Sequence, residues 1–126
     1  MDQLENKQIV TEMYRVLIRD RNFAFIDKYI DDNYIQHSPS VKDGKDGLLS
    51  ALSFLGSLPK SLDAASSRIV RMIAEGDMVM AHLDIKFGGK QIAVVDIFKL
   101  KDKKIIEHWS VEQEVPVDMP HNNGMF

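Results

Sequence analysis

The first third of the chain carries apolar residues at helical spacing. Between residues 2 and 19 they recur three or four positions apart, at Val10, Met13, Tyr14 and Leu17. This spacing places them on one face of a helix. Asp2 followed three positions later by Glu5 resembles a capping box, which starts many helices. We therefore predict a helix over residues 2–19.

Two shorter helices follow in the same pattern. Asn22 can cap a helix over residues 23–30, whose buried stripe consists of Phe23, Ile26 and Ile30. A third helix is predicted over residues 46–55, and Gly56 ends it as glycine commonly ends helices. Its core-facing residues are Leu48, Leu49, Leu52 and Leu55.

The segment over residues 31–46 interrupts the helices. It contains Ser38-Pro39 and several glycines, which exclude a continuous helix or a central strand. We therefore place Tyr34, Gln36 and His37 on a loop or a short extended segment. Loops carry functional residues more often than packed elements do.

From Ser67 onward the pattern alternates instead of following a helical period. Residues 68–74 and 78–87 are predicted strands, and residues 91–113 hold two more apolar, β-branched strands around a charged turn. On the second strand one face carries Val79, Ala81, Leu83, Ile85 and Phe87. The opposite face carries Met78, Met80, His82, Asp84 and Lys86.

The order of elements predicts an α+β fold, because three helices precede four strands that are joined by hairpins. A sheet of this size twists and curls. Helices laid across its concave side would leave a cavity with apolar walls. No repeat or linker divides the chain, so we expect a single domain over residues 1–126.

Composition excludes several classes of protein. Hydrophobic residues make up 44% of the 126 residues, the net charge is −3 and the mean hydropathy is −0.20. No basic stripe favours nucleic acid, and no apolar run is long enough to span a membrane. The polar start of the sequence is unlike a signal peptide, and cysteine is absent. We expect a cytoplasmic protein.

One carboxylate stands out, because Asp96 lies between Val95 and Ile97 in an apolar strand. Burying it costs free energy unless it is paired or hydrogen-bonded. Two interpretations follow. Asp96 is a structural carboxylate that accepts hydrogen bonds from His108 or Trp109, or it transfers protons inside a pocket.

The turn before His108 decides which side chains share a face with Asp96. A two-residue loop, residues 102–103, sets Leu100 opposite Ile105 and Asp96 opposite Trp109. A three-residue loop, residues 101–103, sets Asp96 opposite His108. Because a shift of one residue exchanges the two faces, the distinction is sharp. We expect the three-residue loop, which requires Lys103 in the left-handed region.

Other polar and aromatic side chains are candidates with a structural alternative for each. Tyr14 is either a core aromatic or a hydroxyl that points into a pocket. His37 is either a surface residue or part of the site. The four histidines are 37, 82, 108 and 121, but no His-x-His or His-Glu-x-x-His spacing is present, so we expect no metal site.

Four segments identify a resemblance to a known family. They are YIQHSPSVKDG (34–44), AEGDMVMAHLDI (74–85), AVVDIFKLKDKKIIEHWSVEQEVP (93–116) and NNGMF (122–126). Together they resemble the SnoaL-like polyketide cyclase family of the nuclear transport factor 2-like superfamily, over nearly the whole chain. The resemblance implies a cone-shaped α+β fold, a deep pocket and a homodimer formed through the outer face of the sheet.

The resemblance also implies a chemistry. Characterised relatives catalyse intramolecular aldol condensation with an acidic general base and without a metal or cofactor. Asp96 matches the base, and His108 matches a pocket position beside it. The other implied pocket residues, which would contact a small apolar or carbonyl-containing ligand, are Tyr14, Tyr34, His37, His82 and Trp109.

Because this fold also carries isomerases, dehydratases and proteins without catalytic activity, the fold does not settle the function. Two functions therefore stay open. One is a cofactor-independent lyase or isomerase that resembles an aldol cyclase. The other is a non-catalytic binding module for a small apolar ligand.

Overall fold

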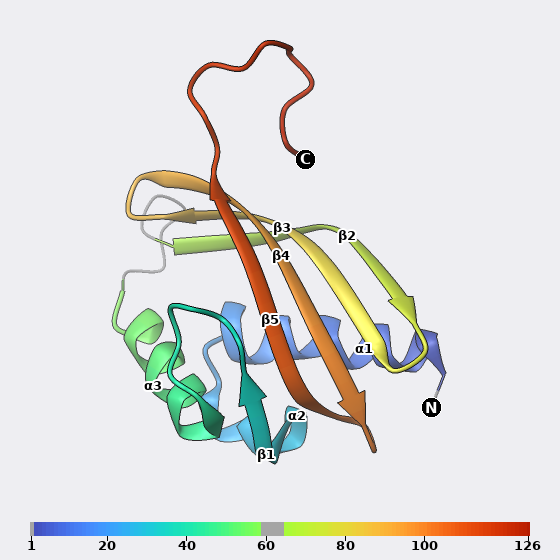
Figure 1. The fold of residues 1–126 in the computed structure, drawn as a ribbon. Coiled ribbons are helices and arrows are strands. Elements are labelled where there is room, and N and C mark those ends of the chain that lie inside the picture. The colour runs from blue at the N-terminus through green and yellow to red at the C-terminus, as the bar shows by residue number, and fades with distance from the viewer. Residues whose placement is uncertain (1, 59–64) are drawn as a thin grey trace.

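Helices cover one face of a curved sheet in this computed structural model, which describes residues 2–58 and 65–126. The sheet has five strands in the order β1-β5-β4-β3-β2. Figure 1 shows α1 lying across the concave side of the sheet and α3 beside β1. The predicted α+β class is confirmed, with one more strand than the four that the pattern predicted.

The first helical stretch covers the predicted range, as an α-helix followed by a π-helix that ends at Arg19. α1 (Gln3–Met13) starts at Asp2, whose side chain accepts a hydrogen bond from the backbone N of Glu5 at 2.6 Å. The helix then widens into a π-helix, η1 (Tyr14–Arg19). The sequence pattern did not predict this wide turn, a rare feature that often occurs at functional sites.

The second predicted helix is shorter than expected. A 3₁₀ turn, η2 (Phe23–Phe25), leads into the single helical turn α2 (Ile26–Tyr29). Asn22 makes no side-chain capping bond, so the predicted cap is wrong. At Ile30 the backbone becomes extended, and the chain continues as a strand.

The segment predicted as irregular contains the additional strand, β1 (Ile30–Gln36). It pairs in parallel with β5, with Ile35 beside Glu107 and Gln36 beside His108. The backbone N of His37 continues the pairing by donating to the carbonyl of His108 at 2.8 Å. Of the two expected conformations, a loop or a short extended segment, the structure has the extended one, and its hydrogen-bond partners come from a distant strand.

The third helix, α3 (Gly44–Gly56), begins two residues before the prediction. Asp43 caps it by accepting from the backbone N of Gly44 at 2.8 Å, and it also accepts from the backbone N of Gln36 at 2.9 Å. These backbone donors lower the pKa of Asp43. Gly47 packs so closely on Lys42 that a Cβ would lie 2.0 Å from its carbonyl oxygen. Asp43 therefore ties the end of β1 to the start of α3.

The four predicted strands form as antiparallel neighbours. Their bounds are β2 (Ala65–Glu75), β3 (Met78–Phe87), β4 (Lys90–Lys101) and β5 (Lys104–Glu114). We call the face toward α1 the inner face and the opposite face the outer face. Val79, Ala81 and Leu83 are buried on the inner face, as the alternation predicts.

The turn between β4 and β5 differs from the expected one. Asp102 and Lys103 form a two-residue turn with φ of 50° and 67°, and Leu100 lies opposite Ile105. The expected three-residue loop is therefore wrong, although Lys103 is left-handed as it required. An irregularity then sets Asp96 opposite Ser110. Because this bulge adds one residue to β5, Asp96 still shares the inner face with His108.

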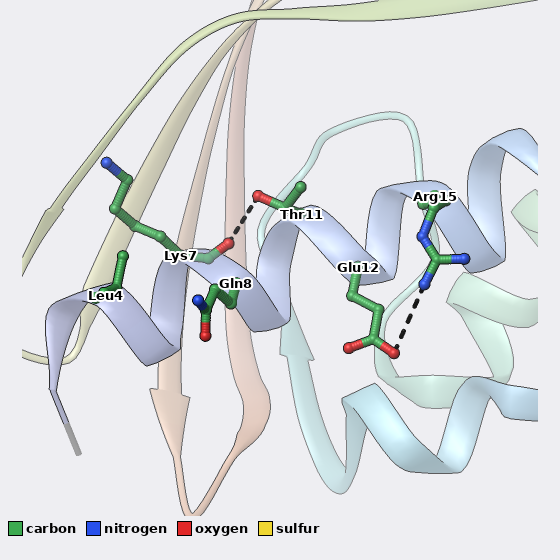
Figure 2. A pocket seen from close by; sticks show the side chains of 6 residues that line it. All are labelled: Leu4, Lys7, Gln8, Thr11, Glu12 and Arg15. Atoms are coloured by element: carbon green, nitrogen blue, oxygen red, sulfur yellow. Dashed lines mark hydrogen bonds and ion pairs between the residues drawn. The ribbon is translucent and has the colours of Figure 1, made fainter.

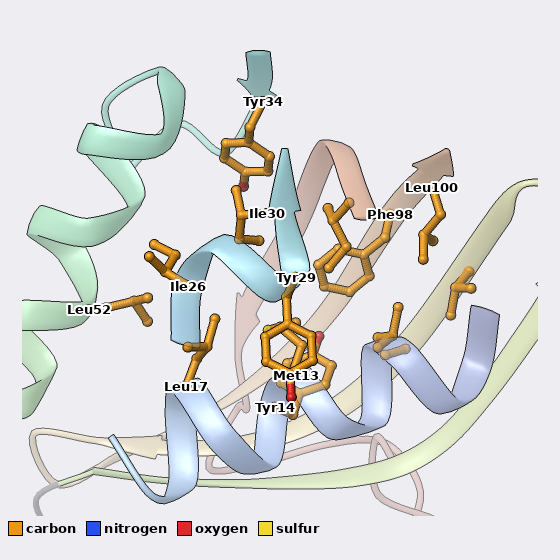
Figure 3. Packing of buried hydrophobic residues seen from close by; sticks show 14 of the residues in the cluster. Met13, Tyr14, Leu17, Ile26, Tyr29, Ile30, Tyr34, Leu52, Phe98 and Leu100 are labelled. Atoms are coloured by element: carbon orange, nitrogen blue, oxygen red, sulfur yellow. The ribbon is translucent and has the colours of Figure 1, made fainter. Parts of the chain in front are cut away.

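The core fills the space between the helices and the inner face of the sheet. Figure 3 shows side chains of η1, α2, α3 and β4 gathered in one buried cluster. Its largest fully buried apolar side chains are Val10, Leu17, Ile30, Val79, Leu83, Leu100 and Ile105. In the described ranges, none of the helices has the length and apolar character needed to cross a membrane.

Two leucines near the start of the chain test this core. Leu17 is 1% exposed, so Leu17→Ala should lower the free energy of unfolding by about 2–5 kcal/mol through lost burial and a cavity. Leu4 is 65% exposed, so Leu4→Ala should change it by less than about 0.5 kcal/mol. Urea unfolding of both variants measures the difference, and equal losses would contradict this packing.

Candidate active site

The carboxylate of Asp96 is the centre of a hydrogen-bonded group on the inner face. The Tyr14 hydroxyl donates to its Oδ2 at 2.5 Å, and Nε2 of His108 lies 2.9 Å from its Oδ1. Asp96 and His108 side chains are each 13% exposed. The structure thus brings together the predicted base, its predicted proton partner and a predicted donor.

The ring of Phe98 packs against both partners of Asp96. It is buried on β4, two residues after Asp96, and therefore on the same face. Its ring meets Tyr14 edge-on, with centroids 5.8 Å apart, and stacks on His108 at 4.9 Å. Such aromatic contacts fix ring orientation as well as burying apolar area. The π-helix begins at Tyr14 itself.

The hydrogen bonds extend from His108 into β1. Nδ1 of His108 lies 2.7 Å from Oε1 of Gln36, and Nε2 of Gln36 donates to the Tyr34 hydroxyl oxygen at 2.8 Å. Gln36 is buried, and the sequence reasoning did not select it. Its position two residues after Tyr34 in a strand was the signal, since alternate residues share a face.

Three serine hydroxyls lie next to this group. Ser110 is opposite Asp96 on β5, and its Oγ donates to Oγ of Ser38 at 2.8 Å. Ser38 Oγ lies 3.4 Å from that of Ser40. These hydroxyls give the inner face a polar edge beside an otherwise apolar and aromatic wall.

Both tyrosines remain protonated in this environment. Burial, the charge of Asp96 and the hydrogen bond to it hold the pKa of Tyr14 well above its usual value. Burial and the charge of Asp96 also raise the pKa of Tyr34, against the opposing effect of its hydrogen bond from Gln36. Each tyrosine therefore keeps a hydroxyl proton to donate.

His37 and Trp109 lie on the outer face, away from Asp96. Their rings stack in parallel with centroids 4.9 Å apart. Nε2 of His37 lies 2.6 Å from Oε2 of Glu107, and its side chain is 41% exposed. The expectation that both side chains share a pocket with Asp96 is not met. Each follows a residue of the inner face by one position, and neighbouring residues in a strand point to opposite faces.

His82 also lies on the outer face. Its Nδ1 contacts Nη1 of Arg71, and its ring stacks on Phe126 at 5.6 Å. The structure therefore does not bring His82 to Asp96. In Figure 1 the C-terminal segment leaves the end of β5 and curls back toward β2 and β3. The terminal ring thus packs on the outer face of the sheet.

A shallow hollow of about 440 Å³ lies on the side of α1 that is turned away from the core. Figure 2 shows its lining residues, which are Leu4, Lys7, Gln8, Thr11, Glu12 and Arg15. None of the predicted site residues is among them. This hollow is therefore a feature separate from the Asp96 group.

Among residues 2–58 and 65–126, no group of three or more histidine, cysteine, aspartate or glutamate side chains is arranged to hold a metal ion. The contacts of Asp96 in this part of the chain come from a hydroxyl and an imidazole.

Comparison with known families shows which family this chain belongs to. The model of the SnoaL-like domain matches residues 10–108. This chain belongs to the SnoaL-like family. The match includes Tyr14, Asp96 and His108, whereas Trp109 and the C-terminal segment lie beyond it. No curated protein matches the sequence.

Solved structures support the fold of this SnoaL-like protein. A candidate polyketide cyclase from Acidithiobacillus ferrooxidans is 20% identical in sequence, with a TM-score of 0.70. The alignment covers 86% of this chain and 87% of the cyclase chain. A candidate ketosteroid isomerase from Kribbella flavida is 13% identical, with coverages of 97% and 87% and a TM-score of 0.73.

A third structure is a nuclear transport factor 2-like protein of unknown function from Burkholderia xenovorans. It is 18% identical, with coverages of 92% and 88% and a TM-score of 0.72. At these identities the three structures show a common fold. The cone-shaped architecture implied by the resemblance is thereby confirmed.

The raised pKa of Tyr14 predicts how stability depends on alkaline pH. A pKa above the unfolded value of 10.0 means that the stabilising contribution is complete below pH 10.0 and is lost as pH rises through the folded value. Tyr14→Phe lacks this titration, so its free energy of unfolding should fall less steeply above that pH. Urea unfolding over an alkaline pH series measures both slopes, and identical slopes would refute the assignment.

Proposed function

We propose that this SnoaL-like protein is a cofactor-independent lyase or isomerase that acts on a small carbonyl compound. Asp96 is its general base. The observation that carries the proposal is a mostly buried strand carboxylate in contact with both a neutral tyrosine hydroxyl and a histidine ring. Within this group the pKa of Tyr14 is raised by burial and by Asp96, and residues with perturbed pKa values are concentrated at functional sites.

The proposed reaction begins with a C–H bond next to a carbonyl. An oxygen of Asp96 takes the proton, and the bonding electrons move onto the carbonyl oxygen to form an enolate. In an aldol cyclisation, the enolate carbon bonds to a second carbonyl carbon of the same substrate. The resulting alkoxide then takes the proton back from the Asp96–His108 pair. In an isomerisation the enolate is reprotonated at another carbon.

The developing negative charge needs hydrogen-bond donors at the enolate oxygen. Tyr14 and Tyr34 keep their hydroxyl protons because their pKa values are raised, and the ring of His108 next to Asp96 is the third candidate donor on the inner face. His37 was expected among the donors but lies on the outer face. Phe98 and its apolar neighbours favour a substrate with a flat or apolar body, so we propose a carbonyl-containing ligand of that kind.

The family and fold support this class of reaction. Two structural neighbours are named as a candidate polyketide cyclase and a candidate ketosteroid isomerase. Both names describe chemistry that passes through an enolate. The arrangement of an aspartate base with tyrosine and acid donors is the division of labour known for ketosteroid isomerase.

A non-catalytic binding module is the alternative, and one observation favours it. Each oxygen of Asp96 already has a side-chain partner, so the carboxylate is satisfied without any ligand. Buried polar groups commonly pair for this reason alone. A bound ligand whose NMR spectrum is unchanged after incubation would support binding without turnover, since isomerisation and cyclisation change the structure of a ligand but not its mass.

We also propose that two copies associate through the outer face. This face exposes Ile73 and Val111 and carries the Trp109 ring beside His37. An apolar patch on a sheet face is typical of a protein interface. The family resemblance implies the same homodimer, and sedimentation of the purified protein measures its mass directly.

The base role predicts the behaviour of Asp96→Asn. Proton abstraction can be followed without the natural substrate, by NMR of α-carbon exchange into D₂O with acetophenone, cyclohexanone and 1-tetralone as probes. Wild type should accelerate exchange of at least one ketone over buffer. Asp96→Asn should lower that rate by about 10²- to 10⁴-fold, because a general base contributes this much.

Asp84→Asn is the matched control, since Asp84 is a strand carboxylate on the outer face that pairs with Arg68 at 3.0 Å. Its exchange rate should equal that of wild type. Circular dichroism establishes that both variants are folded. An Asp96→Asn protein that exchanges as fast as wild type would remove Asp96 from the base role.

A further inference from the structure

The side-chain amide of Gln36 has only one orientation in this site. The backbone N of Ser38 lies 3.0 Å from the Oε1 atom of Gln36. A backbone N–H can only donate, so the atom that it meets must be the amide oxygen and not the amide nitrogen. The usual ambiguity in placing a glutamine amide is therefore absent here.

This orientation determines which nitrogen of His108 carries a proton. The same Oε1 lies 2.7 Å from Nδ1 of His108. An amide oxygen has no hydrogen to donate, so Nδ1 must be the donor. If Nδ1 were unprotonated, its lone pair would face the lone pairs of the oxygen in a buried site, which costs free energy.

A proton must consequently lie between His108 and Asp96. With Nδ1 protonated, the contact of 2.9 Å between Nε2 and Oδ1 contains a proton in one of two ways. Either His108 is an imidazolium beside a carboxylate, or a neutral ring accepts from a protonated Asp96. In both cases Oδ2 still accepts from the Tyr14 hydroxyl, and the imidazolium–carboxylate form is the one in which Asp96 can act as general base.

We propose that Gln36 is a positioning residue that holds His108 with Nδ1 protonated and limits its proton exchange to Nε2. The Asp96–His108 pair then stores one transferable proton on the side of the reacting atoms. This inference rests on the proposed function, which it deepens by assigning the proton that is returned to the intermediate. Asp43 supports the arrangement by binding the backbone N of Gln36 at 2.9 Å.

The protonation of the two ring nitrogens can be measured in the ligand-free protein. Long-range ¹H–¹⁵N NMR distinguishes protonated from unprotonated histidine nitrogens, and His108→Gln identifies the His108 signals. In wild type at neutral pH, Nδ1 should give the signal of a protonated nitrogen. A wild-type spectrum with unprotonated Nδ1 would overturn the proposal without any further variant.

Two substitutions of Gln36 separate positioning from simple packing. Gln36→Leu removes the acceptor, so His108 should move to the neutral form that is protonated at Nε2 alone. Gln36→Glu keeps an acceptor oxygen and should keep Nδ1 protonated. An unchanged ring in Gln36→Leu would contradict the proposal.

The exchange assay on the same variants tests the consequence for catalysis. Gln36→Leu should exchange the ketone probe at least about tenfold more slowly, since a wrong histidine tautomer costs up to ~10⁴ in serine proteases. Gln36→Glu should exchange the ketone probe at about the wild-type rate. A shifted tautomer with an undiminished rate would overturn the positioning role. If wild type exchanges no ketone although Nδ1 is protonated, the proposed function fails and the proton assignment remains.

Discussion

A carboxylate within an apolar strand has to be satisfied by the residues around it, and this requirement organises the inner half of the molecule. Asp96 obtains one partner from a distant helix, the hydroxyl of Tyr14, and the other from the neighbouring strand β5, the ring of His108. The widened turn of η1 begins at the first of these, and Phe98 packs against both. The helices and the sheet thus meet around one hydrogen-bonded group.

The sequence predicted those parts of the fold that depend on local pattern. Helical spacing located α1 and α3, and alternation located the four antiparallel strands. A short extended segment was one of two expectations for β1, but its pairing with β5 could not be predicted, because the paired residues lie more than 70 positions apart in the sequence. The bulge in β5 was equally hidden. It produces the same facing of Asp96 and His108 as the three-residue loop would have produced, although the loop has two residues.

The candidate site, like the fold, could be predicted only in part from the sequence. Asp96, His108 and Tyr14 could be selected from sequence because a polar residue in an apolar pattern requires a partner. His37, His82 and Trp109 matched the motif but face outward, since alternation in a strand places every second side chain on the other face. Gln36 was missed because its importance comes from Ser38 and His108, which orient its amide.

The most direct test of this account is a crystal structure of the protein soaked with 2-naphthol, a stable mimic of an aromatic enolate. We expect the naphthol oxygen within about 2.6–3.2 Å of Asp96 or His108, the range required for proton transfer, with its rings against Phe98. Naphthol bound only elsewhere, such as in the hollow on α1, or an Asp96 enclosed by protein atoms alone, would contradict the claim that this carboxylate meets a substrate.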